Sequence, residues 1–253
     1  MDARGPHRPS PAGVTDAQEP AAAAPRFDIY VAIHKALRHF MNDALLNLGR
    51  MDAEDAAEVE RTCAQAAGLL RELRHHVRSE NDHLHTAIEA RRPAAAARTV
   101  EDHGEHLATI AELEDELLML RRAGGARRQV LAQQFYRHVA LFVAENLQHM
   151  QVEETANNAT LWALYSDEEL VALHGRLLDG IGPAEMALLV RWMARSVAPQ
   201  ELATICLDAR VRLPPDILAP MLELIRAELD EGRRAQLARA LGAAAAPGLV
   251  QAR

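Results

Sequence analysis

The chain has few of the residues that favour β-sheets. Aromatic residues make up 4% of its 253 positions, and β-branched residues rarely follow one another. This composition disfavours strands, and alanine and aliphatic residues at helical spacing supply the apolar surface instead. We therefore expect an all-α protein. The chain is long enough to form one large or two small domains with a buried core.

Several other residue types and runs are scarce. The two cysteines, Cys63 and Cys206, lie far apart within helical patterns, so no disulfide framework is indicated. Lys35 is the only lysine among 28 basic residues, and the formal net charge is −8 with no basic cluster, which disfavours nucleic-acid binding. No apolar run reaches the roughly 20 residues that span a bilayer, and no signal peptide is evident. The sequence predicts no nucleic-acid or membrane partner and a cytoplasmic location.

Turn residues divide the chain into four regions. Residues 1–26, rich in Pro and Ala, and residues 243–253 are expected to be disordered tails. Residues 27–165 carry four long amphipathic patterns with short connections, which predicts an up-down four-helix bundle. Residues 166–242 form an additional C-terminal helical region, available for a homodimer or a protein partner. Its helices are expected near 167–179, 183–196, 199–211, 215–230 and up to 241.

A repeated arrangement of histidine and glutamate is the strongest signal. Each copy is a lone histidine followed later by His-x-x-x-Glu, and the two histidine spacings are 42 and 43 residues. Because residues four apart on an α-helix share a face, each pair directs an imidazole and a carboxylate into the same space. The two copies are His34, His76 and Glu80, and His106, His149 and Glu153.

The predicted bundle brings these six residues to one end. In an up-down bundle, the start of an odd helix is level with the end of an even one. The lone histidines lie near the starts of the first and third helices, and the His-x-x-x-Glu pairs lie late in the second and fourth. Buried carboxylates and charged imidazoles lose several kcal/mol of hydration unless they are paired or bind metal. A metal site removes this difficulty.

The third helix offers two inward-facing histidines, His103 and His106. The repeat favours His106, because its distance to His149 is 43 residues, against 46 for His103. His103 is then a neighbour or an additional ligand. His85 is expected beside the ligands rather than among them. His39 turns about 140° away from the ligand face and is expected at the surface.

Four imidazoles and two carboxylates exceed the four ligands of a structural zinc. A mixed nitrogen and oxygen shell with bridging carboxylates suits two iron or manganese ions, although the ligand types do not exclude zinc. The set differs from the Glu and Glu-x-x-His pattern of ferritin-like bundles. The sequence therefore predicts a dinuclear centre, with two non-heme iron ions as the expected cofactor.

Over residues 27–163 the chain resembles the hemerythrin-like, or HHE cation-binding, domain family. The matching segments are IHKALRHFM, HHVRSEN, EDHGEHLATI and QHMQVEE. The resemblance implies a four-helix bundle that holds a di-iron centre bridged by Glu80, Glu153 and an oxo or hydroxo group. The sequence departs from the family at Asn81, where the family often has a second acid.

Three functions compete at this point. The leading expectation is a di-iron protein that binds, senses or scavenges a small ligand such as O2, NO or peroxide, or that handles iron. The second is a di-iron oxidase or peroxidase. No general acid is evident outside the ligand shell, although Tyr30, one turn before His34, is close enough to hydrogen-bond or ligate. The third is a metal-free helical adaptor, favoured only if the six ligands do not converge.

Overall fold

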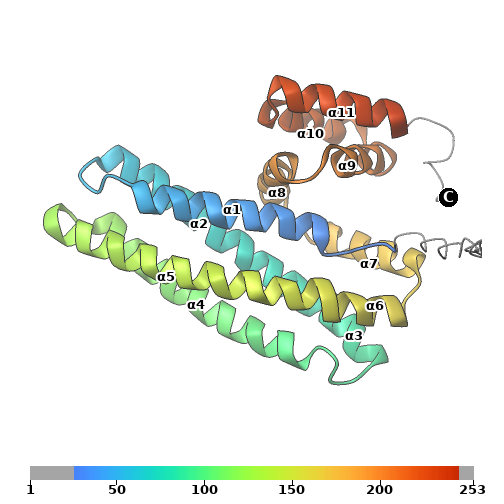
Figure 1. Cartoon of the computed structure of the whole chain (residues 1–253), viewed down its shortest axis with the longest axis horizontal. Helices are drawn as coiled ribbons and strands as arrows, with labels where there is room; N and C mark the ends of the chain where they lie inside the picture. The colour runs from blue at the N-terminus through green and yellow to red at the C-terminus, as the bar shows by residue number, and fades with distance from the viewer. Residues whose placement is uncertain (1–25, 245–253) are drawn as a thin grey trace, which may run out of the picture.

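The computed structural model describes residues 26–244, and the regular structure within that range is entirely helical (Figure 1). The all-α prediction is confirmed for these residues. The expected disordered tails lie outside the described residues, except for Arg26 and residues 243–244. Arg26 forms an ion pair with Asp167, and residues 243–244 end the last helix.

Four long helical segments lie side by side (Figure 1). The first is α1 and the third is α4; the second and fourth each continue through a π-helical turn into a short final helix. The segments are α1 (Val31–Arg50); α2 (Ala56–Glu80) with η1 (Asn81–His85) and α3 (Thr86–Arg91); α4 (Ala97–Arg122); and α5 (Gly125–Val152) with η2 (Glu153–Asn157) and α6 (Asn158–Leu164). Helix α1 packs against α2 and α5, and α4 packs against the same two helices.

Short connections reverse the chain between consecutive segments. At the start of α2, the Asp55 carboxylate accepts hydrogen bonds from the backbone N–H groups of Ala57 and Glu58, at 2.8 and 3.2 Å. These bonds satisfy two donors that a helix N-terminus leaves free. Between α4 and α5 the connection is only residues 123–124, and Gly125 adopts a φ of +54°, which glycine tolerates without strain.

The C-terminal helices follow a regular spacing. They are α7 (Asp167–Asp179), α8 (Pro183–Ser196), α9 (Pro199–Arg212), α10 (Pro215–Glu228) and α11 (Glu231–Ala244). Each begins 16 residues after the one before it. Proline occupies the first turn of α8, α9 and α10, where its missing N–H costs no hydrogen bond.

The C-terminal region shares its apolar core with the long helices. Trp192 of α8 stacks on Phe40 of α1, with ring centroids 4.2 Å apart. Leu170 and Leu173 of α7 are buried in a second cluster that contains Tyr30. Helices α7 and α8 therefore complete the core of residues 27–165. None of the helices between residues 26 and 244 is both long enough and apolar enough to cross a membrane.

One buried carboxyl group is destabilising for this core. Glu72 of α2 is 4% exposed, and its Oε2 has no hydrogen-bond partner among the described residues. Burial, together with the charge of Glu185, raises the pKa of Glu72 from 4.5 to about 7. The folded protein therefore retains this proton between pH 4.5 and 7, where the unfolded chain releases it. Stability falls as the pH rises through this window, by on the order of 3 kcal/mol in total.

Replacing Glu72 with glutamine should remove this pH-dependent loss. We expect the metal-free Glu72→Gln protein to unfold several degrees higher than the wild type at pH 8, and at nearly the same temperature at pH 4.5. Thermal unfolding followed by circular dichroism at both pH values measures the difference. Glu105→Gln, which changes an exposed carboxylate of α4, is the control. An equal shift at both pH values would contradict a buried ionisation.

Candidate metal centre

Each His-x-x-x-Glu pair lies at the junction of an α-helix and a π-helical turn. Glu80 is the last residue of α2 before η1, and Glu153 is the first residue of η2. A single π-helical turn inside an α-helix is rare and often occurs at a functional site, because the extra residue changes which side chains face inward. Both turns lie at the same end of the molecule, next to the start of α1 and of α4.

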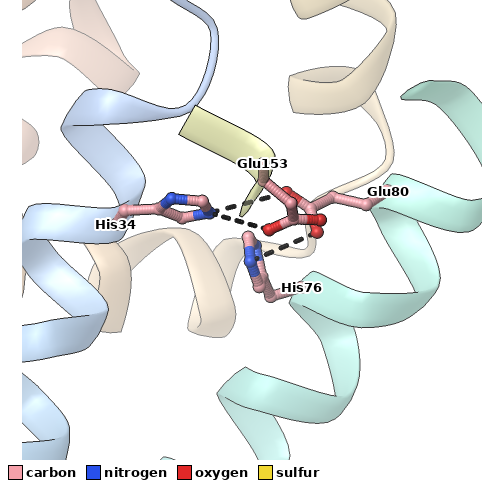
Figure 2. Close-up of side chains that lie close together, drawn as sticks. All are labelled: His34, His76, Glu80 and Glu153. Carbon is pink, nitrogen blue, oxygen red and sulfur yellow. Dashed lines mark ion pairs between the residues drawn. The ribbon is translucent and has the colours of Figure 1, made fainter. Parts of the chain in front are cut away.

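The structure brings two overlapping groups of ligand-type side chains together. All members are buried, and within each group the ligand atoms lie within 4.8 Å of one another. Figure 2 shows the first group, in which both imidazoles point toward the paired carboxylates. Glu80 and Glu153 belong to both groups. The first group is His34, His76, Glu80 and Glu153, and the second is Glu80, His103, His149 and Glu153.

The separations between donor atoms match those expected around metal ions. Donor atoms bound to one ion at about 2.1 Å, at angles between 90° and tetrahedral, lie roughly 3.0–3.4 Å apart. His34 Nε2 is 3.4 Å from Glu153 Oε2, and His76 Nε2 is 3.4 Å from Glu80 Oε2. In the second group, His149 Nε2 is 3.2 Å from Glu153 Oε1 and 2.9 Å from His103 Nε2. Three of these four separations fall within that range, and the separation between His103 and His149 lies just below it.

Five of these atoms lack hydrogen-bond partners among the described residues. Within residues 26–244, the Nε2 atoms of His34 and His76, Glu80 Oε2 and both carboxylate oxygens of Glu153 are buried without a partner. A buried polar atom left unpaired costs about 1–3 kcal/mol, and more when it is charged. Five such atoms that face one shared space are hard to explain as a structural arrangement alone. A bound cation would satisfy all of them.

The charges in the centre are strongly coupled. Burial lowers the pKa of His34, but the hydrogen bond to Glu154 and the nearby carboxylate of Glu80 outweigh burial and raise it to about 9. His103 follows the same balance, with Glu153 and Glu80 raising its pKa to about 9. Burial lowers the pKa of His76 to about 4. Protons on His34 and His103 therefore offset the two carboxylates, and a metal ion bound by their Nε2 atoms would displace these protons.

A second layer of side chains holds the outer ring nitrogens. Asn81, which follows Glu80, accepts a hydrogen bond from His103 Nδ1 at 2.8 Å. Glu154, which follows Glu153, accepts one from His34 Nδ1 at 3.0 Å. The residue after each glutamate therefore holds a histidine of the other helical hairpin. With Nδ1 occupied as a donor, each imidazole presents Nε2 to the centre, as a metal-binding histidine does.

Two further contacts complete this outer layer. Arg38, one turn after His34, donates to Glu154, and together with His34 it lowers the pKa of that carboxyl group to about 2 despite burial. Asp102 faces His149 Nδ1 at 3.2 Å. The outer partners differ in charge. His34 and His149 have carboxylates, whereas His103 has the neutral amide of Asn81.

On helix α4 the structure groups His103 with the carboxylates. His103 Nε2 is 3.4 Å from both Glu80 Oε2 and Glu153 Oε1. His106 is buried beside them, with its ring 4.8 Å from that of His149, and it forms no ion pair with a carboxylate of the described chain. Five of the six principal candidates of the repeat therefore converge. His103, predicted as a neighbour or an additional ligand, lies with the carboxylates, and His106 belongs to neither group.

Two further side chains, His85 and Tyr30, lie buried beside the two groups. His85 is 2% exposed and stacks on His103, with ring centroids 4.7 Å apart. Tyr30 is fully buried, with its ring 5.4 Å from that of His34 and its hydroxyl unpaired among the described residues. Burial and the charges of Glu153 and Glu80 hold the pKa of Tyr30 well above 10.

His39 lies outside the centre, as expected. Its Nδ1 is 3.0 Å from Ser196 Oγ, and its ring meets that of Trp192 edge-on. It therefore contributes to the contact between α1 and α8.

Comparison of the chain with protein-family models, with curated proteins and with solved structures found no match. The case for function therefore depends on the geometry of the centre.

Proposed function

We propose that the protein is a non-heme di-iron protein whose centre binds a small ligand such as O2, NO or peroxide. One observation carries the proposal: two groups of buried ligand-type side chains share Glu80 and Glu153. Shared carboxylates are the bridging ligands of dinuclear centres, and a mixed nitrogen and oxygen shell favours iron or manganese over calcium or magnesium. We also propose that α1, α2–α3, α4 and α5–α6 form an up-down four-helix bundle of the hemerythrin type.

The protein residues have distinct roles in this proposal. Glu80 and Glu153 would contribute to both ions and offset their charge. His34 and His76 would complete one half of the centre, and His103, rather than His106, would join His149 in the other. Bound iron would supply redox chemistry and open coordination positions for an exogenous ligand.

The surroundings favour ligand binding over turnover of an organic substrate. The centre is buried where α2 meets η1 and α5 meets η2, and its acid-base groups face one another. Tyr30 has a free buried hydroxyl near the two glutamates that can donate a hydrogen bond to a small bound molecule. The convergence of histidines and carboxylates argues against a metal-free adaptor.

Spectroscopy of the iron-loaded protein tests the proposed function. We expect the diferric protein to develop a new visible charge-transfer band when azide is added, and the diferrous protein to change its spectrum with NO or O2. A His39→Ala variant, altered outside the centre, should respond as the wild type does. If iron-loaded protein gives no azide band and no response to NO, the centre has no open position and small-ligand binding is excluded.

A further inference from the structure

The π-helical turn η1 changes the direction in which His85 faces. In an uninterrupted α-helix, the fifth residue after Glu80 would lie about 140° away from it. Residues 81–85 instead form a π-helical turn, which takes one residue more to complete. The fifth residue then falls where the fourth would fall in an α-helix. His76, Glu80 and His85 consequently share the face that lines the centre.

The surroundings of His85 are those of an oriented ligand. Its Nδ1 is 3.0 Å from Asn81 Oδ1, the same oxygen that faces His103 Nδ1 at 2.8 Å. A carbonyl oxygen with two lone pairs accepts both bonds. One amide thereby holds two stacked imidazoles. The opposite nitrogen, His85 Nε2, is buried, has no hydrogen-bond partner among the described residues, and is 3.8 Å from Glu153 Oε1.

We propose that His85 is a third histidine ligand of the metal ion held by His103 and His149, and that Asn81 positions both His85 and His103. This inference rests on the proposed di-iron function. It is carried by the orientation of Nε2, which points to Glu153 and has no other partner. A histidine buried for packing alone would leave that nitrogen unsatisfied.

The corresponding position in the other half carries a different residue. Asn158 follows Glu153 by five residues across the turn η2, as His85 follows Glu80 across η1. Asn158 is fully buried, and neither of its amide atoms has a partner in the described part of the chain. An amide is a weaker ligand than imidazole for iron. The half at His34 and His76 therefore holds its ion with fewer histidines and is the weaker of the two.

Metal titration of the full chain tests the role of His85. His85→Phe keeps a ring stacked on His103 and removes both nitrogens. We expect this variant to bind one metal ion with more than about 100-fold lower affinity, since loss of an outer-layer partner alone costs roughly 10–100-fold. Asn81→Leu should show that smaller loss. His83→Ala is the control, because His83 lies in the same turn and its Nδ1 is bonded to the backbone oxygen of Ser79.

A second measurement separates ligation from packing. In the cobalt-loaded protein, each coordinated imidazole contributes one exchangeable N–H proton shifted by the paramagnetic ion, and His85→Phe should lose one such signal. Circular dichroism of the metal-free variant checks folding. If the wild type binds two ions and His85→Phe binds both with unchanged affinity and signals, His85 is not a ligand, although the di-iron proposal stands. If the wild type binds no ions, the proposed function itself fails.

Discussion

Replacing Glu153 with glutamine is expected to remove both metal ions, whereas replacing His76 or His149 with alanine is expected to remove only one. Glu153 faces His34 through one carboxylate oxygen and His103 and His149 through the other, so its loss affects both halves. His76 and His149 each belong to one half. Glutamine retains the size of the side chain but not its charge, which is needed to offset two cations.

The measurement is metal content after saturation and removal of excess metal. We expect about two ions per chain in the wild type, about one in His76→Ala and in His149→Ala, and close to none in Glu153→Gln. Glu145→Gln, which changes an exposed carboxylate on the preceding helix α5, should retain two. Two ions in Glu153→Gln would show that the glutamate is not a shared ligand.

A second large effect is expected on helix α4. His103→Ala should lose one metal ion, because His103 Nε2 is 3.4 Å from both carboxylates. His106→Ala should retain both ions and lose only the packing of its ring against Phe142 and His149. Metal analysis of the two variants, purified in parallel, gives the comparison. The opposite outcome, with metal lost in His106→Ala and kept in His103→Ala, would restore the 43-residue repeat as the correct register.

The limits of the sequence are clearest at these two histidines. The 42- and 43-residue spacings identify equivalent histidines only if both helical hairpins have the same length. The structure has a longer second hairpin, since α4 continues 19 residues beyond His103, whereas α1 continues 16 residues beyond His34. Turn residues show where each hairpin reverses, but they do not show how many residues separate the turn from the histidine that faces the carboxylates. A better signal is the residue after each glutamate, because Asn81 and Glu154 hold His103 and His34 in corresponding ways.

The sequence predicts His85 beside the ligands rather than among them, for a different reason. A helical wheel with a constant angle per residue places His85 on a different face from Glu80. The segment NDHLH contains no pattern that predicts a π-helical turn. The helix boundaries were easier, because proline and glycine act locally on the backbone. The starts of α8, α9 and α10 at Pro183, Pro199 and Pro215 were all predicted correctly. Helix boundaries depend on local residues and could be predicted. Which side chains lie together at the centre depends on how the helices are aligned in the fold.

The sequence also did not predict which helices α8 packs against. Its amphipathic pattern was compatible with packing on the long helices, on other C-terminal helices or on a partner. The stacking of Trp192 on Phe40 settles this for one face of α8, because both rings lie in the same apolar core. An amphipathic pattern indicates that the apolar face of a helix is covered, but it does not identify the element that covers that face.

The most direct test of the proposed dinuclear centre is an anaerobic titration of the metal-free protein with ferrous iron in competition with a chelator of known affinity. Two ions should bind per chain, the first more tightly than the second, because we propose that His85, which stacks on His103, adds a third imidazole to the half at His103 and His149. Proton release should accompany binding, since His34 and His103, each with a pKa of about 9 in the metal-free protein, must lose their protons. Binding of fewer than two ions, or binding that survives the loss of both His76 and His149, would contradict the dinuclear centre.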